Sequence, residues 1–405
     1  MKFLHLSDLH IGKRVNEFSM LEDQRIILNQ ILTLADREKV DGVWIAGDIY
    51  DKTVPSAEAV QLFDDFLTGL VKRGLLCFII SGNHDSAERI AFGARLMDQC
   101  GVYLSPVFHG AIEPVELEDE YGKLRIYLLP FLKPAYVRQA CPESGVESYQ
   151  EAVQLVVDRI CGKTGEEKPR ESGNCDERPA GSADRSMTAW DPQCRNVILA
   201  HQFIIGAARC ESEEVSVGGL DQISAETFRE FDYVALGHLH MPQTVGDDKI
   251  RYCGTPLKYS FSEARGEKSV TVVELKEKGN TSWYQIPLKL RRDMREIRGT
   301  YMELTNRESY KDTNVEDYLH VTLTDEEDVP DALGKLRSIY PNIMKLDYDN
   351  LRTRNGQTIT AEEAVEQKRP MELFEELYRL QNNQEMSREQ RKFAEEMIEK
   401  IWTQL

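Results

Sequence analysis

Five short polar motifs, each directly after an apolar segment, constrain the fold of this chain more than any other feature. In chain order they are Asp8-Leu9-His10, Gly47-Asp48 with Asp51, Gly82-Asn83-His84-Asp85, Ala200-His201 and Gly237-His238-Leu239-His240. Five of the eight histidines lie in these motifs. By chance a G-H-x-H would occur about 0.05 times in a chain of this length and a G-N-H-D about 0.003 times, so the ordered set is not a coincidence.

The segments before the first three motifs have the length and composition of buried strands. Residues 2–7, 42–46 and 75–80 are such segments, and helices predicted over 21–39 and 56–72 connect them. Strands that alternate with helices are typical of an α/β domain. In such domains ligands gather at the carboxyl ends of the strands, which is where each motif lies.

Further apolar segments extend this first domain, which we expect to cover residues 1–285. They are predicted strands at 124–130, 196–200 and 233–236 and a closing hairpin of 269–275 and 281–288 around Gly279-Asn280. One stretch inside the domain, residues 162–195, is rich in Gly, Glu, Pro, Ser and Arg and has few large apolar side chains. Such a stretch cannot bury enough surface to offset chain entropy, so we predict a disordered surface insertion.

The rest of the chain divides into two smaller parts. Residues 286–350 combine alternating segments such as 320–323 with a helical pattern, which predicts a small α+β capping domain. Residues 360–405 are predicted to be helical, with Ser387 and Gln390 as a capping box. The last helix carries a wide apolar stripe, which packs either on the chain's own core or on a partner helix.

Charge and composition narrow the location and the partners. The net charge of −19 argues by itself against a nucleic-acid partner, although bound cations would reduce it where a phosphate must sit. A basic cluster is either a solvated linker face or a phosphate contact; its members are Lys289, Arg291, Arg292, Arg295 and Arg298. The chain shows no signal peptide, no apolar run of about 18 residues and no C-x-x-C pair, so we expect a cytoplasmic protein with free thiols and no membrane contact.

The residue types in the motifs suit a pair of divalent cations. In phosphodiester hydrolysis water must attack a crowded anion, and two cations about 3.5–4 Å apart activate the water and neutralise the phosphoryl oxygens. Such a pair needs a bridging carboxylate and mixed oxygen and nitrogen ligands, which aspartate, asparagine and neutral imidazole supply. A ligand set without thiolate favours Mn, Fe or Zn over Ca. The histidines outside the motifs, His5, His109 and His320, are expected to be structural.

His84 is expected to differ from the other motif histidines. It is the neighbour of Asn83, so the two side chains cannot easily reach one metal. A histidine that binds no metal here could contact the scissile phosphate and stabilise its charge or protonate the leaving oxygen. Asp51 could hold this imidazole in its charged form, and Asp85 is the alternative.

The five motifs resemble those of the calcineurin-like metallophosphoesterase superfamily. Two segments narrow the resemblance to the SbcD family, the nuclease subunits of bacterial SbcCD complexes: SGNHDSAER at 81–89 and GTPLKYSFSE at 254–263. The similarity covers most of residues 1–275 and is weaker over 285–350, and the insertion at 162–195 departs from it. The resemblance implies a four-layer α/β/β/α catalytic domain, a small α+β capping domain and C-terminal helices.

The resemblance also implies roles for the motif residues. One Mn²⁺ would be held by Asp8, His10, Asp48 and His240. A second would be held by Asp48, Asn83, His201 and His238, with Asp48 bridging the two. His84 would then be the catalytic residue that faces the phosphate, oriented by Asp51.

The implied activities are 3′–5′ exonuclease action on double strands, endonuclease action on single strands and hairpin opening, in DNA repair, recombination and replication near the nucleoid. The implied partners are a second copy of the nuclease domain and an SbcC ATPase, whose coiled coil would bind the C-terminal helices. This chain has no G-x-x-x-x-G-K-[ST] loop, in agreement with an ATPase on the partner. The alternatives are a metallophosphodiesterase for a small or protein phosphoester, which would use the same ligands, and a scaffold on an inactive fold, which should have lost some.

Overall fold

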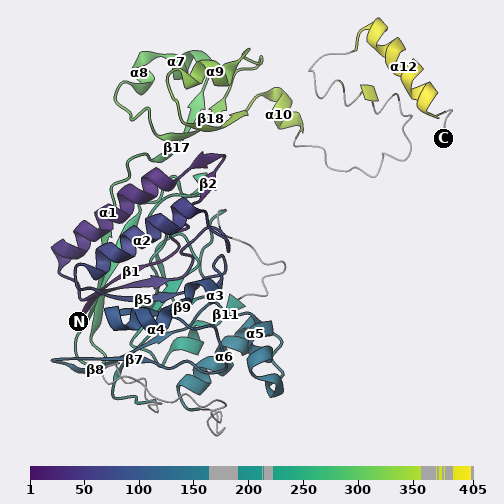
Figure 1. The fold of residues 1–405 in the computed structure, drawn as a ribbon. Helices are drawn as coiled ribbons and strands as arrows, with labels where there is room; N and C mark the ends of the chain where they lie inside the picture. The colour runs from purple at the N-terminus through teal and green to yellow at the C-terminus, as the bar shows by residue number, and fades with distance from the viewer. Residues whose placement is uncertain are drawn as a thin grey trace. The chain divides into compact units, whose positions relative to one another are not determined.

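The computed structural model describes residues 1–163, 190–211, 213, 222–356, 371, 374–375, 378 and 386–402 (Figure 1). The chain divides into two compact units, Met1–Arg291 and Arg292–Leu405. Most of the insertion predicted at 162–195, and most of the tail before residue 386, lies outside the described residues. Among the helices of the described part, none combines the length and the apolar character that crossing a membrane would require.

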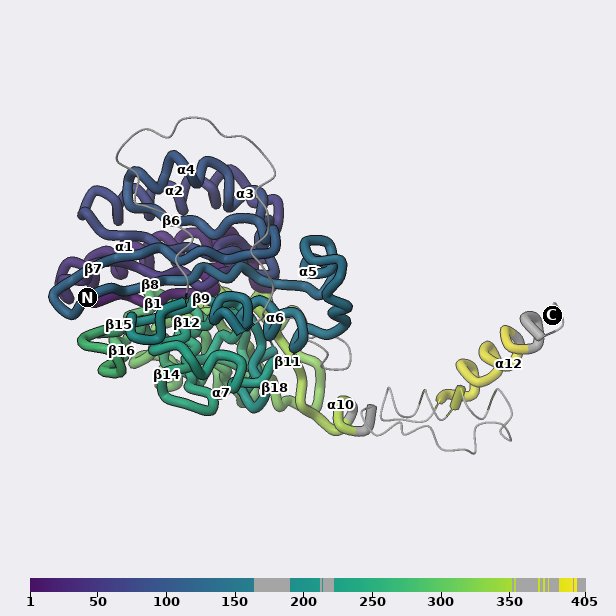
Figure 2. The backbone as a smooth tube through the Cα atoms, turned by 90° about the horizontal axis from the view of Figure 1, so that it is seen from below, coloured from purple at the N-terminus to yellow at the C-terminus, as the bar shows by residue number. Residues whose placement is uncertain are grey.

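The first unit contains two six-stranded sheets. One has the order β16-β15-β1-β4-β5-β6. Its strands are β1 (Lys2–Leu6), β4 (Gly42–Ala46), β5 (Leu76–Ile80), β6 (Val102–Leu104), β15 (Ser269–Leu275) and β16 (Thr281–Pro287). β1, β4, β5 and β6 are parallel to one another. β15 pairs antiparallel with β1 and with β16, so the predicted closing hairpin is confirmed. Figure 2 shows the N-terminal strand β1 in the interior of the unit, with β15 beside it.

The second sheet has the order β13-β14-β12-β9-β8-β7. Its strands are β7 (Val115–Asp119), β8 (Gly122–Leu128), β9 (Arg195–His201), β12 (Tyr233–Gly237), β13 (Gln243–Val245) and β14 (Asp247–Tyr252). The four central strands are parallel, and each edge strand is antiparallel to its neighbour. The predicted strands before the fourth and fifth motifs are therefore adjacent in this sheet.

Helices cover the outer faces of the two sheets. The helices α1 (Leu21–Glu38) and α2 (Ala57–Val71) lie side by side on one side of the strands, and α5 (Pro134–Ala140) and α6 (Tyr149–Ile160) lie on the other (Figure 1). Shorter elements complete the unit: β2 (Arg14–Val15), β3 (Phe18–Ser19), α3 (Ala87–Ile90), α4 (Ala94–Met97), β10 (Phe203–Ile204) and β11 (Gln222–Ile223). The four-layer α/β/β/α class implied by the resemblance is confirmed.

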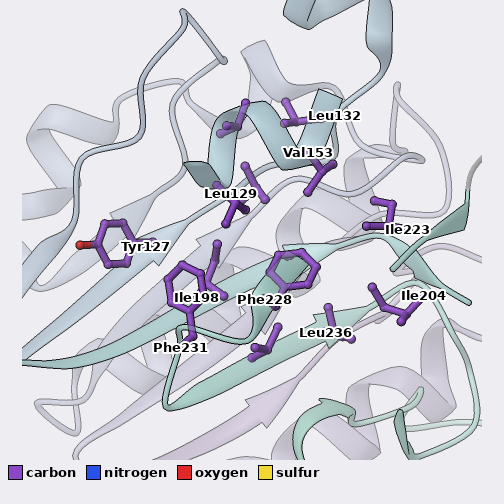
Figure 3. Close-up of a cluster of buried hydrophobic side chains, with 14 of the residues drawn as sticks. Tyr127, Leu129, Leu132, Val153, Ile198, Ile204, Ile223, Phe228, Phe231 and Leu236 are labelled. Atoms are coloured by element: carbon purple, nitrogen blue, oxygen red, sulfur yellow. The ribbon is translucent and has the colours of Figure 1, made fainter. Parts of the chain in front are cut away.

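Side chains alternate between the two faces of each strand. One face contributes to an apolar layer between the two sheets, and the other face contributes to an apolar layer between a sheet and the helices that cover it. Phe3, Trp44 and Phe78 from the first sheet meet Val197 and Tyr233 from the second in the inner layer, where the rings of Phe3 and Trp44 stack with centroids 4.6 Å apart. An outer layer packs α6 on the second sheet, with Val153 of the helix near Ile198 and Leu236 of the strands (Figure 3).

The second unit is a small α+β module. Three parallel strands form its sheet in the order β17 (Met294–Gly299), β18 (Tyr318–Leu323) and β19 (Ile343–Tyr348). The helices of its described part are α7 (Tyr301–Thr305), α8 (Arg307–Tyr310), α9 (Ala332–Arg337), α10 (Leu351–Gly356) and α12 (Arg388–Trp402). Leu319, Val321 and Leu336 are fully buried in its core. The predicted capping box before α12 is confirmed, because Ser387 and Gln390 each accept the backbone N–H of the other.

The packing between the sheets predicts that Phe3→Ala destabilises the first unit strongly. The side chain is completely buried and stacks on Trp44. Its loss should lower the free energy of unfolding by about 3–5 kcal/mol, because a cavity remains between the sheets. Urea denaturation followed by tryptophan fluorescence measures the change. The matched control is Phe92→Ala, whose ring is 84% exposed and whose loss should cost no more than about 0.5 kcal/mol. Equal losses from both variants would contradict this account of the core.

Candidate metal centre

The five motifs meet at the carboxyl ends of strands from both sheets. β1, β4 and β5 are neighbours in one sheet, and β9 and β12 are neighbours in the other. Three groups of three residues could each hold a metal ion, because the ligand atoms within a group lie within 4.8 Å of one another. The groups are Asp8, His10 and His240; His10, Asp48 and His84; and Asp8, Asp48 and His201. The structure therefore brings together six of the predicted residues in these groups alone. Asn83 and His238 join them through the contacts described below.

Several motif residues have a left-handed backbone conformation that residues other than glycine rarely adopt. The φ angles of Asp8, His10, Asp48 and His238 are 52°, 43°, 50° and 101°. Each such residue costs about 1–3 kcal/mol unless the surroundings hold it. Hydrogen bonds between the motifs hold these four. The N–H of Asp8 donates to Gly47 O (3.0 Å), that of His10 to Asp48 O (3.0 Å) and that of His238 to the Asp8 carboxylate (3.0 Å).

The carboxylate of Asp48 lies at the centre of the group. Its Oδ2 is 3.7 Å from His10 Nε2, 3.3 Å from His201 Nε2 and 4.0 Å from His84 Nε2. Its Oδ1 accepts the backbone N–H of His84 (2.9 Å). A Cβ at Gly82 would lie 2.1 Å from this oxygen, so only glycine allows the loop after β5 to approach Asp48 so closely.

Asn83, His201 and His238 form the side of the site that belongs to the second sheet and β5. Asn83 Oδ1 is 3.0 Å from His201 Nε2 and 3.2 Å from His238 Nδ1. His201 Nδ1 donates to Ala46 O (2.8 Å), since a carbonyl can only accept, and its Nε2 therefore faces the other ligands. A Cβ at Gly237 would lie 1.9 Å from the same Ala46 oxygen, so glycine is required where the two sheets meet.

His84 contacts the main chain of Asp51. His84 Nδ1 donates to Asp51 O (3.1 Å), and its Nε2 points towards Asp48. The Asp51 carboxylate instead accepts a hydrogen bond from Lys13 Nζ (2.8 Å) and lies 3.7 Å from His10 Nδ1. His84 and Asp51 are therefore in contact through the Asp51 main chain, and the role of the Asp51 carboxylate in holding His84 charged stays a prediction.

Asp85, the alternative partner for His84, has a different position. Its carboxylate accepts the backbone N–H groups of Ile49 (3.1 Å), Tyr50 (3.0 Å) and Gly82 (3.0 Å). Burial and the neighbouring Asp48 raise the pKa of Asp85 to about 6. This side chain thus ties the loop after β4 to the loop after β5.

Some residues that shape the site were not predicted. Gln24 on α1 donates from Nε2 to His10 O (2.8 Å), and Tyr259 donates to Leu9 O (2.5 Å), so both hold the first motif from behind. Glu263 lies 3.6 Å from His240 Nδ1, and Lys268 donates to the main-chain oxygen of the same histidine (2.9 Å). Tyr259 and Glu263 lie in the segment 254–263, which contributed to the resemblance but indicated no role for individual residues, and Gln24 and Lys268 had no sequence signal.

The buried groups shift one another's pKa values. Burial raises the pKa of Asp8 to about 8, against the pull of His201. Burial works to lower the pKa of His201, but Asp48 outweighs it and raises this pKa to about 9. Burial works to raise the pKa of Asp48, but the ion pair with His201 outweighs it and lowers this pKa. Burial and the charge of His201 lower the pKa of His238 to about 3. The protein by itself thus favours a proton on Asp8 and on His201 near neutral pH.

The donor set fits divalent cations. It combines two buried carboxylates, an amide oxygen and four imidazoles, which are ligands suited to first-row transition metals. The Nε2 atoms of His10 and His240 face each other at 3.2 Å. That is close to the separation of two neighbouring ligands that each lie about 2.1 Å from one cation. The protons favoured on Asp8 and His201 occupy positions where a cation would supply the positive charge instead.

The remaining histidines and the basic cluster lie outside this group. His5 is buried between the sheets, where it contacts Tyr233 Oη (3.1 Å) and Leu236 O (3.1 Å), and His320 pairs with Asp347 in the second unit (2.8 Å). His109 is exposed. Three arginines of the basic cluster already contact carboxylates: Arg291 with Glu22, Arg295 with Asp317 and Arg298 with Asp349.

Comparisons with known proteins place the chain among phosphoesterases. Residues 1–242 match the family described as calcineurin-like phosphoesterase, and residues 290–382 match SbcD_C, described as type 5 capsule protein repressor C-terminal domain. The SbcD subunit of the nuclease SbcCD from Staphylococcus epidermidis is 31% identical over 348 residues, which cover 85% of each chain. Among solved structures, a dimetal phosphatase from Danio rerio matches with 13% identity and a TM-score of 0.40, over 71% of this chain and 96% of that one. The chain therefore belongs to the SbcD family of calcineurin-like metallophosphoesterases and is a phosphoester hydrolase of that fold.

Proposed function

We propose that this protein is the nuclease subunit of an SbcCD-type complex and hydrolyses phosphodiester bonds of DNA with two Mn²⁺ ions. One observation carries the proposal. Oxygen and nitrogen ligands from five strand ends converge in a chain that is 31% identical to a protein named as the SbcD subunit of the nuclease SbcCD. The proposed action is 3′–5′ exonuclease cleavage of double strands, endonuclease cleavage of single strands and hairpin opening.

The proposed ligand sets follow the two sides of Asp48. Asp8, His10, Asp48 and His240 would hold one cation, and Asp48, Asn83, His201 and His238 the other. The position of Asp48 Oδ2 between His10 (3.7 Å) and His201 (3.3 Å) supports a bridging role. When bound, the two cations activate the attacking water and neutralise charge on the phosphate.

His84 is assigned a role with the substrate. It is the most exposed of the motif histidines that surround Asp48, with 19% of its side chain accessible against 1% for His10 and none for His201. Its Nδ1–H is used by Asp51 O, so Nε2 is the atom that would meet a phosphate oxygen. A proton held at Nε2 would stabilise the developing charge or pass to the leaving oxygen.

The proposed assembly is a homodimer of nuclease domains that works with an SbcC-type ATPase near the nucleoid of the cytoplasm. The C-terminal helices would provide the surface for the ATPase. Within the described residues, exposed Phe393 (66%) and Met397 (46%) lie one turn apart on α12 and support an apolar docking face.

The DNA substrate is tested with defined phosphodiesters. With Mn²⁺ and an SbcC partner, the protein should degrade linear duplex DNA and open hairpins. Bis(nitrophenyl) phosphate should be a slow substrate of the same site, because the ligands are shared. Cleavage is measured on end-labelled DNA. Hydrolysis of the nitrophenyl ester with duplex and hairpin left intact would reject the nuclease and favour a metallophosphodiesterase for small substrates.

The roles of His84 and Asp48 predict different losses. His84→Ala should lower cleavage by at least about 100-fold, the usual contribution of a general acid or charge stabiliser, while two Mn²⁺ still bind. Asp48→Ala should lose Mn²⁺ because it removes the shared carboxylate. Calorimetric titration and the cleavage assay measure the two effects. His320→Ala, a histidine of the second unit, is the control and should change neither. Loss of Mn²⁺ from His84→Ala would make His84 a ligand.

The pKa values of Asp8 and His201 predict that Mn²⁺ affinity rises with pH. Below about 8 and 9, respectively, each group holds a proton that the cation must displace. Affinity should therefore increase between pH 6.5 and 8.5, by about tenfold per pH unit for each proton released. Titrations in two buffers with different ionisation enthalpies count these protons. Asp8→Asn should reduce the count. An affinity that does not vary over this range would contradict the assignment.

A further inference from the structure

A buried network of three side chains surrounds His240. Lys268 Nζ donates to His240 O (2.9 Å), Thr255 Oγ1 (2.6 Å) and Glu263 Oε2 (2.5 Å), so its three N–H groups are all used. The N–H of Thr255 also donates to His240 O (3.1 Å). All four residues are at most 3% exposed. The residues come from the segment that follows β14 and reach across to the loop after β12.

Stability alone does not account for this network. Removing the two charges of Glu263 and Lys268 from water costs several kcal/mol per ion, roughly what their attraction returns. Apolar residues of the same volume would serve a core equally well or better. The ion pair of Glu263 and Lys268 contacts both the main chain and the ring of His240, a candidate metal ligand. Its role is therefore sought in the metal centre.

The geometry of the His240 ring supplies that explanation. Its Nε2 faces His10 Nε2 at 3.2 Å, within the candidate metal centre. Its Nδ1, on the far side of the ring, faces Glu263 Oε1 at 3.6 Å. This distance is longer than a hydrogen bond, so Glu263 acts here as a nearby negative charge. A carboxylate behind a metal-binding imidazole orients the ring and makes its other nitrogen a better donor.

The two sides of the centre differ in this respect. His201 on the other side donates its Nδ1–H to Ala46 O, a neutral acceptor. Of these two histidines, only His240 has a carboxylate near its Nδ1. The two cation positions are therefore supported by different partners, and a change at Glu263 should affect one of them.

We infer that Glu263, held in place by Lys268 and Thr255, is a positioning residue that aligns His240 and strengthens the binding of one of two divalent cations. The inference rests on the metal centre of the proposed function but not on its DNA substrate. Glu263 acts through His240 and touches neither the substrate nor the reacting atoms.

The test is calorimetric titration of the full chain with Mn²⁺ in the absence of DNA. Glu263→Gln keeps the shape of the side chain and removes its charge, so one of two binding steps should weaken by about 10–100-fold while the other is unchanged. Glu263→Asp keeps the charge and should recover part of the loss. Because Glu263→Gln leaves the Lys268 ammonium buried without its partner, the double variant Glu263→Gln/Lys268→Met is titrated beside it and should show the same weak step.

The matched control is Glu116→Gln, which removes a carboxylate from the ion pair with Arg125 (2.7 Å) at the edge strand β7. It should bind both Mn²⁺ ions as the wild type does. Wild-type affinity at both steps in Glu263→Gln and in the double variant would overturn the inference, and so would an equal loss in Glu116→Gln. A wild-type protein that binds no Mn²⁺ would instead reject the metal centre of the proposed function.

Discussion

The main-chain contact between the two sheets at the carboxyl ends of β4 and β12 determines the site. Gly237 lies against Ala46 O with no room for a Cβ, and His201 donates to the same oxygen (2.8 Å). Side chains usually keep packed sheets apart, and at this point the glycine lets candidate ligands from both sheets come within a few ångströms of each other. A larger residue at position 237 would push the two halves of the ligand set apart, whatever the ligands themselves were.

This contact also explains why the loops of the site have strained backbones. A left-handed residue turns the chain sharply, and Asp8, His10 and Asp48 use such turns to direct consecutive side chains into one small volume. The strain is offset by the hydrogen bonds between the motifs and by further groups around them, of which Gln24 and Tyr259 were not predicted. Asp85 accepts three backbone N–H groups, and Gln24 and Tyr259 bind the main chain of the first motif. The candidate ligands are thus held in place by contacts within the protein itself.

The sequence pattern was enough to predict the sheet strands that carry the motifs, the α/β class and the residues that converge, while the four-layer arrangement was implied by the family resemblance. This was possible because apolar strands followed by Asp, Asn and His leave a local signal, and the carboxyl ends of parallel strands share an edge. Contacts between distant segments leave no such signal. Lys268 and Glu263 are recognisable as neighbours of His240 only after β14 and β15 are placed, and periodicity cannot tell whether Asp51 contacts His84 through its carboxylate or its main chain. The insertion predicted at 162–195 falls largely outside the described residues and stays a prediction.

Under the proposed function, the negative charge of the chain implies that cations at the metal centre would also attract the substrate. A net charge of −19 repels a polyanion, and three arginines of the basic cluster are already engaged with carboxylates. Two divalent cations would bring four positive charges to the strand ends and would displace about two protons, one from Asp8 and one from His201, so the local charge would rise by about two. Because the surrounding groups are buried, this charge is screened less than surface lysines or arginines would be. Under the proposed function, cations held by these residues would therefore attract a phosphate as well as activate water for its hydrolysis.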